Sequence, residues 1–123
     1  MAEHILFTDT PQKSSFAVIG AGNGGQAMAG FLALRGFGVN LWNRSKYAVE
    51  TLNHTGGIIL HGEISGRASP NLVTQDMGLA VNETKIIMVT VPASGHRYVA
   101  KQMAPRLSDG QIIVLNPGRT GGA

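Results

Sequence analysis

Four glycines fall within six positions of this chain, and they constrain its fold more than any other feature. They occur in the stretch GAGNGG, which follows an apolar run at residues 16–19 and precedes a helical pattern at 24–35. Glycine weakens regular structure, so such a cluster indicates that another group comes close to this backbone. Gly20, Gly22 and Gly25 complete the pattern G-x-G-x-x-G.

Each glycine of this pattern has its own physical role. The first permits a tight turn, the second lets a pyrophosphate approach the backbone, and the third lets the helix pack closely on the strand. The phosphates then lie at the positive end of the helix dipole, against free N–H groups. An ordinary glycine-rich turn is the alternative, but the order strand, glycines, helix favours the phosphate site. The predicted cofactor-binding residues of this turn are Gly20, Ala21, Gly22, Asn23, Gly24 and Gly25.

Strand and helix patterns alternate along the rest of the chain. Apolar runs at 39–42, 58–61, 85–91 and 111–115 indicate further strands, and helical patterns cover 46–53, 77–81 and 93–103. Residues 63–67 and 72–74 are typical of short strands joined by glycine and proline turns. This order predicts an α/β fold of the Rossmann type: a doubly wound parallel sheet with a small hairpin insertion after the third strand.

The helix at 24–35 is expected to have one apolar face. Ala27, Phe31 and Leu34 fall at i, i+4 and i+7, which places them on one side of a helix. The sequence therefore predicts that these three side chains form the apolar face of this helix.

Length and composition suit a single domain with its own core, since the chain has 123 residues and is 43% hydrophobic. Residues 1–15 are polar and mixed, so we expect a flexible N-terminal extension there and a dinucleotide-binding domain over residues 16–123. The sequence has no run of 18 apolar residues, no signal-peptide pattern and no cysteine. We therefore expect no membrane partner and a cytoplasmic location.

The net charge of +3 raises the question of nucleic-acid binding. The ten Lys and Arg are scattered, without a basic helix or aromatic–basic interleaving, so no nucleic-acid partner is expected. A small anionic ligand accounts for a local basic site equally well. His4, His54 and His61 have no metal-ligand spacing, so no metal site is expected either.

The end of the second strand bears on which dinucleotide binds. NAD- and FAD-binding folds of this type usually place Asp or Glu there, about 20 residues after the glycines, to accept from the ribose hydroxyls. This chain has Asn43, Arg44 and Ser45 instead. An arginine pairs with a 2′-phosphate and stacks on adenine, and a serine hydroxyl donates a further hydrogen bond. The turn favours NADP(H), with NAD(H) as the alternative if Arg44 is a solvated surface residue.

Two later turns are expected at the same edge, because ligands of open α/β sheets bind outside the carboxyl ends of the strands. They add six predicted cofactor-binding residues: Val91, Pro92, Ala93, Asn116, Pro117 and Gly118. His96 opens the helix after the first of these turns. It is a candidate substrate contact or proton carrier, and a wet surface histidine is the alternative.

Four stretches resemble the N-terminal domain of the octopine/nopaline (opine) dehydrogenase family. They are FAVIGAGNGGQAMAGFLALRGFGVNLWNRS, IILHGEISGRAS, KIIMVTVPASGHRYVA and GQIIVLNPGRTGGA, and they run from about residue 16 to the last residue. The chain is similar, more loosely, to the N-terminal domain of NAD-dependent glycerol-3-phosphate dehydrogenase and to ketopantoate reductase. The glycine loop is common to all of these, whereas VPASGH and LNPGRTGGA point to the opine branch.

The resemblance implies a two-domain, NAD(P)-dependent oxidoreductase that reversibly condenses an amino acid with an α-keto acid such as pyruvate. In that family a C-terminal domain carries the catalytic histidine. We expect that domain to be absent from this chain, so the catalytic residues are unknown and the chain alone is expected to be inactive. By the family pattern, the turn from Asn116 to Arg119 lies near the nicotinamide. The substrate pair and the oligomeric state stay open. A glycerol-3-phosphate dehydrogenase-like enzyme and a non-catalytic NADP(H)-sensing module are the alternative functions.

Overall fold

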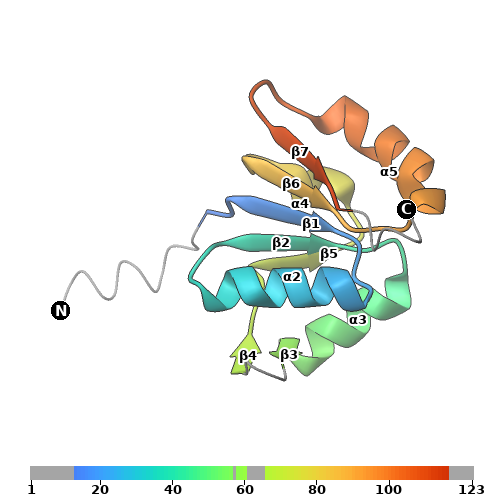
Figure 1. Ribbon diagram of the computed structural model, residues 1–123. Coiled ribbons are helices and arrows are strands. Elements are labelled where there is room, and N and C mark those ends of the chain that lie inside the picture. Colours follow the sequence, from blue (N-terminus) through green and yellow to red (C-terminus); the bar gives the residue numbers. More distant parts are fainter. Residues whose placement is uncertain (1–12, 57, 61–65, 117–123) are drawn as a thin grey trace.

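The computed structural model describes residues 13–56, 58–60 and 66–116 of the chain (Figure 1). A central sheet contains strands β1 (Phe16–Ile19), β2 (Val39–Trp42), β5 (Leu72–Thr74), β6 (Ile86–Val89) and β7 (Ile112–Leu115). The helices are α2 (Asn23–Leu34), α3 (Lys46–Thr55), α4 (Met77–Val81) and α5 (His96–Met103), with 3₁₀ segments η1 (Ala93–Gly95) and η2 (Ala104–Arg106). None of the described helices is long and apolar enough to cross a lipid bilayer.

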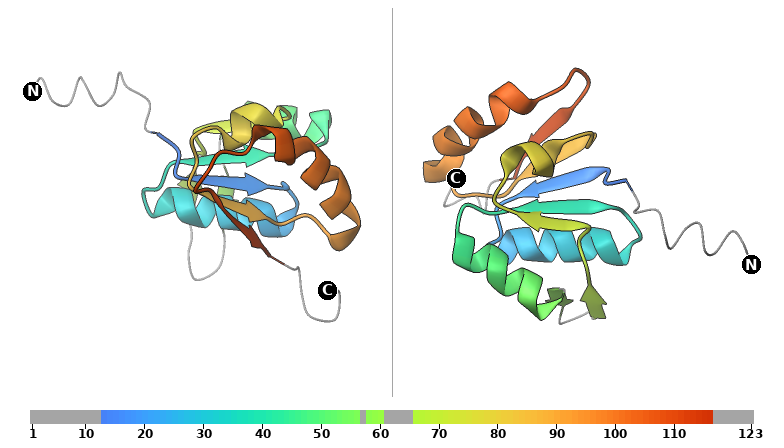
Figure 2. Two further views of the ribbon diagram at one scale, coloured as in Figure 1. Left: turned by 90° about the horizontal axis from the view of Figure 1, so that it is seen from above. Right: turned by 180° about the vertical axis from the view of Figure 1, so that it is seen from behind.

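The strands of the central sheet lie in the order β5-β2-β1-β6-β7, and each neighbouring pair is parallel. The chain steps outward from β1 to β2 and β5, and then crosses to β6 on the other side of β1. Helices α2 and α3 cover one face of the sheet, and α4 and α5 cover the other (Figure 2). The order reverses beside β1, which is the switch point of a doubly wound sheet. The predicted fold class is confirmed.

The hairpin lies before the third strand of the sheet, so its predicted position is wrong. Strands β3 (Ile58–Leu60) and β4 (Gly66–Ala68) pair antiparallel outside the central sheet, and β5 pairs with β2 instead. Ile58 is buried in the cluster beneath α2, and β3 contacts that helix instead of joining the central sheet. The N–H of Asn71 donates to the Val39 carbonyl oxygen at 2.8 Å, which aligns β5 with β2.

Two apolar clusters fill the space on either side of the sheet. Val18 of β1 packs in the cluster beneath α2, whereas its neighbours Ala17 and Ile19 pack beneath α4 and α5. Successive side chains of a strand point to opposite faces, and here both faces are covered. This double burial explains why the central strands are continuous apolar runs rather than alternating ones.

Helix α2 packs on the sheet with a different face from the one predicted. Its buried residues are Gly25, Ala29, Gly30 and Leu32. Phe31 is partly buried, but Ala27 is exposed and Leu34 is 39% exposed. Small residues let the helix axis approach the strands closely, so the periodic large side chains lie at the flank of the contact. The prediction for Ala27 and Leu34 is therefore wrong.

The fold begins earlier than the predicted boundary between residues 15 and 16. The N–H of Ser15 donates to the Gly38 carbonyl oxygen at 3.0 Å, and the Ser15 carbonyl oxygen accepts from the N–H of Lys85 at 2.9 Å. These bonds continue the ladders on both sides of β1. The predicted extension therefore overlaps the folded part at Ser14 and Ser15, and its residues 1–12 lie outside the described residues.

A buried amide ties β2 to its surroundings. Asn40 is 7% exposed; its Oδ1 accepts from Ser14 Oγ at 2.7 Å, and its Nδ2 donates to the Ala80 carbonyl oxygen at 2.9 Å. Asn40→Leu keeps the volume but takes the amide donor from the Ala80 carbonyl oxygen in a buried place, and it leaves Ser14 Oγ with its bond from Asn71 Nδ2 alone. We expect it to lower the free energy of unfolding by about 1–3 kcal/mol in urea titrations.

Ser14→Ala is the matched control for this substitution. It removes the hydroxyl that donates to Asn40 Oδ1 and leaves the bond from Asn40 to Ala80 intact. The expected loss in the free energy of unfolding is therefore smaller, about 0.5–1.5 kcal/mol. An Asn40→Leu domain as stable as the wild type would mean that the amide is not needed to hold β2 in place.

Candidate functional site

The carboxyl ends of β1, β2, β6 and β7 lie at one edge of the sheet, because the four strands are parallel neighbours. The turns that follow them bring most of the predicted cofactor-binding residues to this edge (Figure 1). These residues are Gly20, Ala21, Gly22, Asn23, Gly24, Gly25, Asn43, Arg44, Ser45, Val91, Pro92, Ala93 and Asn116. Pro117, Gly118 and Arg119 lie outside the described residues.

The turn after β1 requires glycine at two positions for different reasons. Gly20 has φ +121°, a backbone conformation that side chains rarely allow. A Cβ at Gly25 would collide with the Gly20 carbonyl oxygen, and it would lie 2.8 Å from Thr90 Oγ1. Helix α2 therefore touches the end of β1 backbone to backbone. This contact brings the first turn of the helix directly over the carboxyl edge of the sheet.

The N-terminus of α2 is open to a ligand. Its N-cap is Gly22, which has no side chain to accept a hydrogen bond from the first turn, and that turn holds no acidic residue. Gly22, Asn23 and Gly24 are all exposed. The leading N–H groups of a helix have no partner within the helix and carry a partial positive charge. The arrangement fits an anion such as a pyrophosphate.

Hydrogen bonds from three elements hold this turn in shape. The N–H of Ala21 donates to Asn43 Oδ1 at 2.9 Å, and the Ala21 carbonyl oxygen accepts from Gln26 Nε2 at 2.9 Å. The Thr90 hydroxyl lies 3.1 Å from the carbonyl oxygens of Ile19 and Gly20 and donates to them. The turn is thus fixed from β2, from α2 and from the end of β6 before any ligand binds.

Sequence reasoning missed Gln26 and Thr90. Thr90 did leave a signal, since it is the polar residue that interrupts the apolar run 86–91, next to the edge where ligands are expected to bind. Gln26 left none, because its bond to Ala21 depends on the shape of the turn. Asn43 is at the predicted edge, but its oxygen is engaged by the turn, so the group it presents for further bonding is the Nδ2 amide.

The end of β2 presents hydrogen-bond donors. Arg44 is exposed, and its guanidinium lies over the ring of Tyr98, with Cζ 3.9 Å from the ring centroid. Ser45 caps α3, where its Oγ accepts from the N–H of Ala48 at 3.2 Å, which leaves its hydroxyl hydrogen available to donate. With Asn43 Nδ2, this gives an amide, a guanidinium and a hydroxyl in three successive residues, and no carboxylate among them.

The turn after β6 carries Pro92, Ala93 and the predicted substrate contact His96. The ring Nε2 of His96 lies 3.2 Å from the Val91 carbonyl oxygen, so the tautomer with a proton on Nε2 donates to its own turn. The ring is half-buried and borders an apolar hollow of about 240 Å³ formed by α5, β6 and β7. This geometry gives His96 a role in fixing the turn, and its contact with a substrate stays a prediction.

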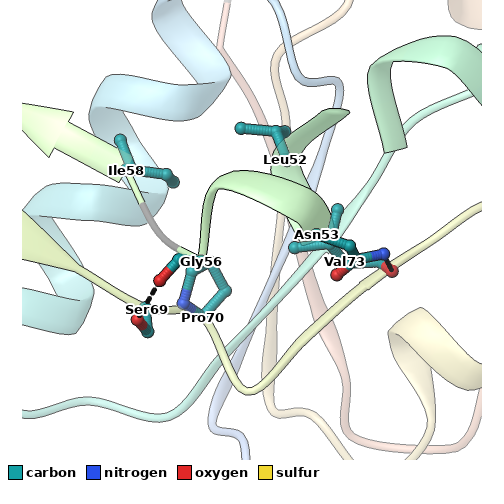
Figure 3. Close-up of a pocket in the computed structure, with 7 residues that line it drawn as sticks. All are labelled: Leu52, Asn53, Gly56, Ile58, Ser69, Pro70 and Val73. Carbon is teal, nitrogen blue, oxygen red and sulfur yellow. Dashed lines mark hydrogen bonds between the residues drawn. The ribbon is translucent and has the colours of Figure 1, made fainter. Parts of the chain in front are cut away.

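A second hollow lies away from the carboxyl edge, between the end of α3 and the strands β3 and β5 (Figure 3). Its volume is about 160 Å³. The polar groups at its rim bond to one another: Ser69 Oγ donates to the Gly56 carbonyl oxygen at 3.0 Å, and Asn53 Nδ2 donates to that of Val73 at 3.2 Å. No charged side chain lines this hollow. The carboxyl edge is therefore the better candidate for binding an anionic ligand.

The described residues contain no group of three or more His, Cys, Asp or Glu side chains placed to hold a metal ion. Within the same residues, every buried side-chain nitrogen or oxygen has a hydrogen-bond partner. The chemistry of the carboxyl edge therefore consists of main-chain N–H groups, the donors after β2 and the His96 turn.

A family model described as the NAD-dependent glycerol-3-phosphate dehydrogenase N-terminus matches residues 15–116. The chain belongs to this family. Members of the glycerol-3-phosphate dehydrogenase N-terminal family thus share the region that holds all the elements described above, from β1 to β7.

Two relatives and one solved structure add to this assignment. Opine dehydrogenase of Arthrobacter sp. (strain 1C) is 42% identical over 113 residues, which are 91% of this chain and 32% of that protein. Glycerol-3-phosphate dehydrogenase (NAD(P)+) of Moorella thermoacetica is 35% identical over 109 residues, covering 83% of this chain and 30% of that protein. A structure of octopine dehydrogenase in complex with NADH and agmatine has a TM-score of 0.74 at 24% identity, covering 89% of this chain and 30% of that one.

The resemblance predicted from the sequence is confirmed for both the opine and the glycerol-3-phosphate dehydrogenases. These relatives are dehydrogenases, so the chain is a dinucleotide-binding part of an oxidoreductase family. It spans about a third of the length of the relatives that it matches.

Proposed function

We propose that this chain is the cofactor-binding domain of an opine-type dehydrogenase, which reversibly condenses an amino acid with an α-keto acid such as pyruvate. The observation that carries the proposal is the open N-terminus of α2 beside the glycine turn at the carboxyl edge. The 42% identity to an opine dehydrogenase supports the opine branch. In this proposal the folded part of the chain, which includes Ser14 and Ser15, forms the dinucleotide domain, and a second domain of the whole enzyme supplies the catalytic residues.

The glycine turn binds the pyrophosphate of the cofactor in this proposal. Main-chain N–H groups at the start of α2 donate to the phosphate oxygens, and the helix dipole adds attraction. Because Asn43, Gln26 and Thr90 already hold the turn, binding does not require it to be ordered anew. Such preorganisation lowers the entropic cost of binding.

The donors after β2 select NADP(H) over NAD(H). A 2′-phosphate offers acceptor oxygens and a double negative charge, which suit the amide of Asn43, the guanidinium of Arg44 and the hydroxyl of Ser45. The ribose diol of NAD(H) has two hydroxyl hydrogens to donate, and an Asp or Glu normally accepts them. This chain has no carboxylate at that place.

The remaining turns line the nicotinamide side of the cofactor. Val91, Pro92 and Ala93 follow β6, and Asn116, Pro117 and Gly118 follow β7. The cofactor supplies the hydride, and this chain contributes the surface that orients the nicotinamide. The bond from His96 to the Val91 carbonyl oxygen keeps the first of these turns in one conformation.

A binding titration tests the proposal directly. NADPH and NADH are titrated separately into the 123-residue chain, and isothermal titration calorimetry measures the binding of each. We expect saturable binding of both, with NADPH tighter by roughly tenfold to a hundredfold, the range given by hydrogen bonds to a charged group. A chain that binds neither dinucleotide is not a cofactor-binding domain.

The chain by itself is expected to bind cofactor without turnover. Holding a substrate against the nicotinamide lowers the activation barrier by about 7–11 kcal/mol, and one positioned acid or base raises the rate by about 10²–10⁴-fold. At this edge the described residues offer a single histidine, His96, which is bonded to its own turn. The measurement is NADPH oxidation at 340 nm with pyruvate and a panel of amino acids. Steady turnover that is lost in His96→Ala would place the catalytic machinery in this chain.

A glycerol-3-phosphate dehydrogenase-like enzyme is the second candidate function. The family model over residues 15–116 favours it, and the glycine turn serves both enzymes equally. The two candidates differ in substrate, so the whole enzyme distinguishes them: opine chemistry requires both pyruvate and an amino acid for NADPH oxidation, whereas the alternative requires dihydroxyacetone phosphate alone.

A further inference from the structure

Four residues beside the carboxyl edge are joined in a closed circuit of ring contacts and hydrogen bonds to main-chain carbonyl oxygens. Tyr98 of α5 packs against Trp42 of β2, with ring centroids 6.5 Å apart and planes inclined by 32°. Trp42 Nε1 donates to the Gln75 carbonyl oxygen at 2.7 Å, and Gln75 Nε2 donates to the Arg44 carbonyl oxygen at 3.0 Å. The guanidinium of Arg44 then lies over Tyr98 and closes the circuit.

This arrangement fixes Arg44 at both ends although the residue is exposed. Gln75 holds its main chain, and Tyr98 supports its guanidinium, with Cζ 3.9 Å from the ring centroid. Tyr98 in turn lies on Trp42, which is 2% exposed and belongs to the core. The position of the guanidinium is therefore coupled to the core of the domain, to helix α5 and to the turn after β5.

The stacking leaves the hydrogen-bonding part of Arg44 free. A guanidinium contacts an aromatic ring with its flat face, and its N–H groups point outward in its own plane. The same side chain can therefore stay on Tyr98 while its edge donates two parallel bonds to a phosphate. A long side chain that is already held in place loses less conformational freedom when the phosphate arrives.

We propose that Tyr98 is a positioning residue that holds Arg44 ready for the 2′-phosphate of NADP(H), and so contributes to the choice between the two dinucleotides. The proposal rests on the proposed function, because it requires that a dinucleotide binds at this edge. It assigns to α5, a helix outside the G-x-G-x-x-G unit, a part in cofactor specificity. The ring carries this role, since the contacts of Tyr98 described here are made by its ring.

The test compares NADPH and NADH affinities of the wild-type chain with those of Tyr98→Phe and Tyr98→Leu. Tyr98→Leu is expected to weaken NADPH binding by roughly 3- to 10-fold, because an Arg44 side chain that the ring no longer holds must be ordered when the phosphate binds. NADH affinity is expected to change less than about twofold. Tyr98→Phe keeps the ring and is expected to match the wild type for both cofactors. Tyr98→Met refills the space over Trp42 without a ring, and it replaces Tyr98→Leu if the latter unfolds.

A double-mutant cycle separates positioning from general damage. In an Arg44→Ala background, Tyr98→Leu is expected to change NADPH affinity by less than about twofold, because the side chain that the ring supports is gone. Equal losses for NADPH and NADH in Tyr98→Leu, or a loss in Tyr98→Phe as large as in Tyr98→Leu, would overturn the inference and leave the proposed function standing. A wild-type chain that binds neither dinucleotide would refute the proposed function itself.

Discussion

Replacing Gly22 by Val is expected to weaken NADPH binding by at least about 100-fold, while the free energy of unfolding falls by no more than about 1 kcal/mol, the order of a poorer N-cap residue. A Cβ at Gly22 meets no atom within 4 Å, and its φ of −74° and ψ of −169° suit an ordinary residue. The domain therefore tolerates the side chain. The added methyl groups stand in front of the first N–H groups of α2, where the proposal places the pyrophosphate.

Gly25→Val, in contrast, is expected to lose stability as well as affinity. Its Cβ would collide with the Gly20 carbonyl oxygen, so α2 must move away from β1 or the turn must open. We expect a loss of several kcal/mol of stability, of the order seen for overpacked cores, measured by urea unfolding. Cofactor affinity then falls because the folded state is depleted.

Ala27→Val is the matched control for bulk. Ala27 is exposed on α2, five positions after Gly22 and two after Gly25, so an apolar enlargement is made on the same helix away from its first N–H groups. Its expected effects on affinity and stability are small. Undiminished NADPH binding by Gly22→Val would show that the phosphates do not approach this turn.

The parts of the fold that follow from local signals were predictable from the sequence. The strand at Phe16–Ile19, the glycines and the helix after them are adjacent in the chain, and their order alone indicates how they pack. The third strand depends on a choice between two apolar segments. Ile58–Leu60 and Leu72–Thr74 look alike as strands, and the difference between them is long-range pairing: Leu72–Thr74 pairs with β2, next to the bond from Asn71 to Val39.

The face of α2 was mispredicted for a similar reason. The spacing of apolar residues along a helix identifies its most hydrophobic side. The side that packs on this sheet is instead the one with small residues, because they let the helix approach the strands closely. Gly25 and Ala29 lie four positions apart on that side, and their small size allows the backbone contact with Gly20. A glycine that serves phosphate binding thereby also sets the orientation of the helix.

The sequence predicted where the candidate site residues lie better than it predicted what each of them does. Parallel strands bring their carboxyl ends together, so the turns after β1, β2, β6 and β7 were expected at one edge. The bonds within that edge join residues far apart in the chain: Asn43 reaches Ala21, and Thr90 reaches Ile19. One sequence does not reveal such pairs, and they decide which atoms are left for a ligand.

The double substitution Asn43→Asp with Arg44→Ala is expected to invert the cofactor preference. Asp has the shape of Asn and keeps an oxygen for the N–H of Ala21, a bond of 2.9 Å in this structure. Its second oxygen replaces an amide donor with a charged acceptor, which suits the ribose diol and repels a 2′-phosphate. Arg44→Ala removes the cation that pairs with that phosphate, so the two changes act in the same direction.

The ratio of NADPH to NADH affinity is expected to fall by roughly 10²–10³-fold in the double variant, since a hydrogen bond to a charged group contributes about 1.5–3 kcal/mol and 1.4 kcal/mol corresponds to tenfold. Calorimetric titration of both cofactors into the wild type, each single variant and the double variant measures it. Asn43→Ala is the control: it releases the N–H of Ala21 and loosens the phosphate turn, so it is expected to weaken both cofactors. NADPH is expected to lose more, because the amide donor to the 2′-phosphate is also gone, but the preference is not inverted since no carboxylate is introduced. A double variant that still prefers NADPH would place the 2′-hydroxyl away from Asn43 and Arg44, and the donors after β2 would have no part in the choice.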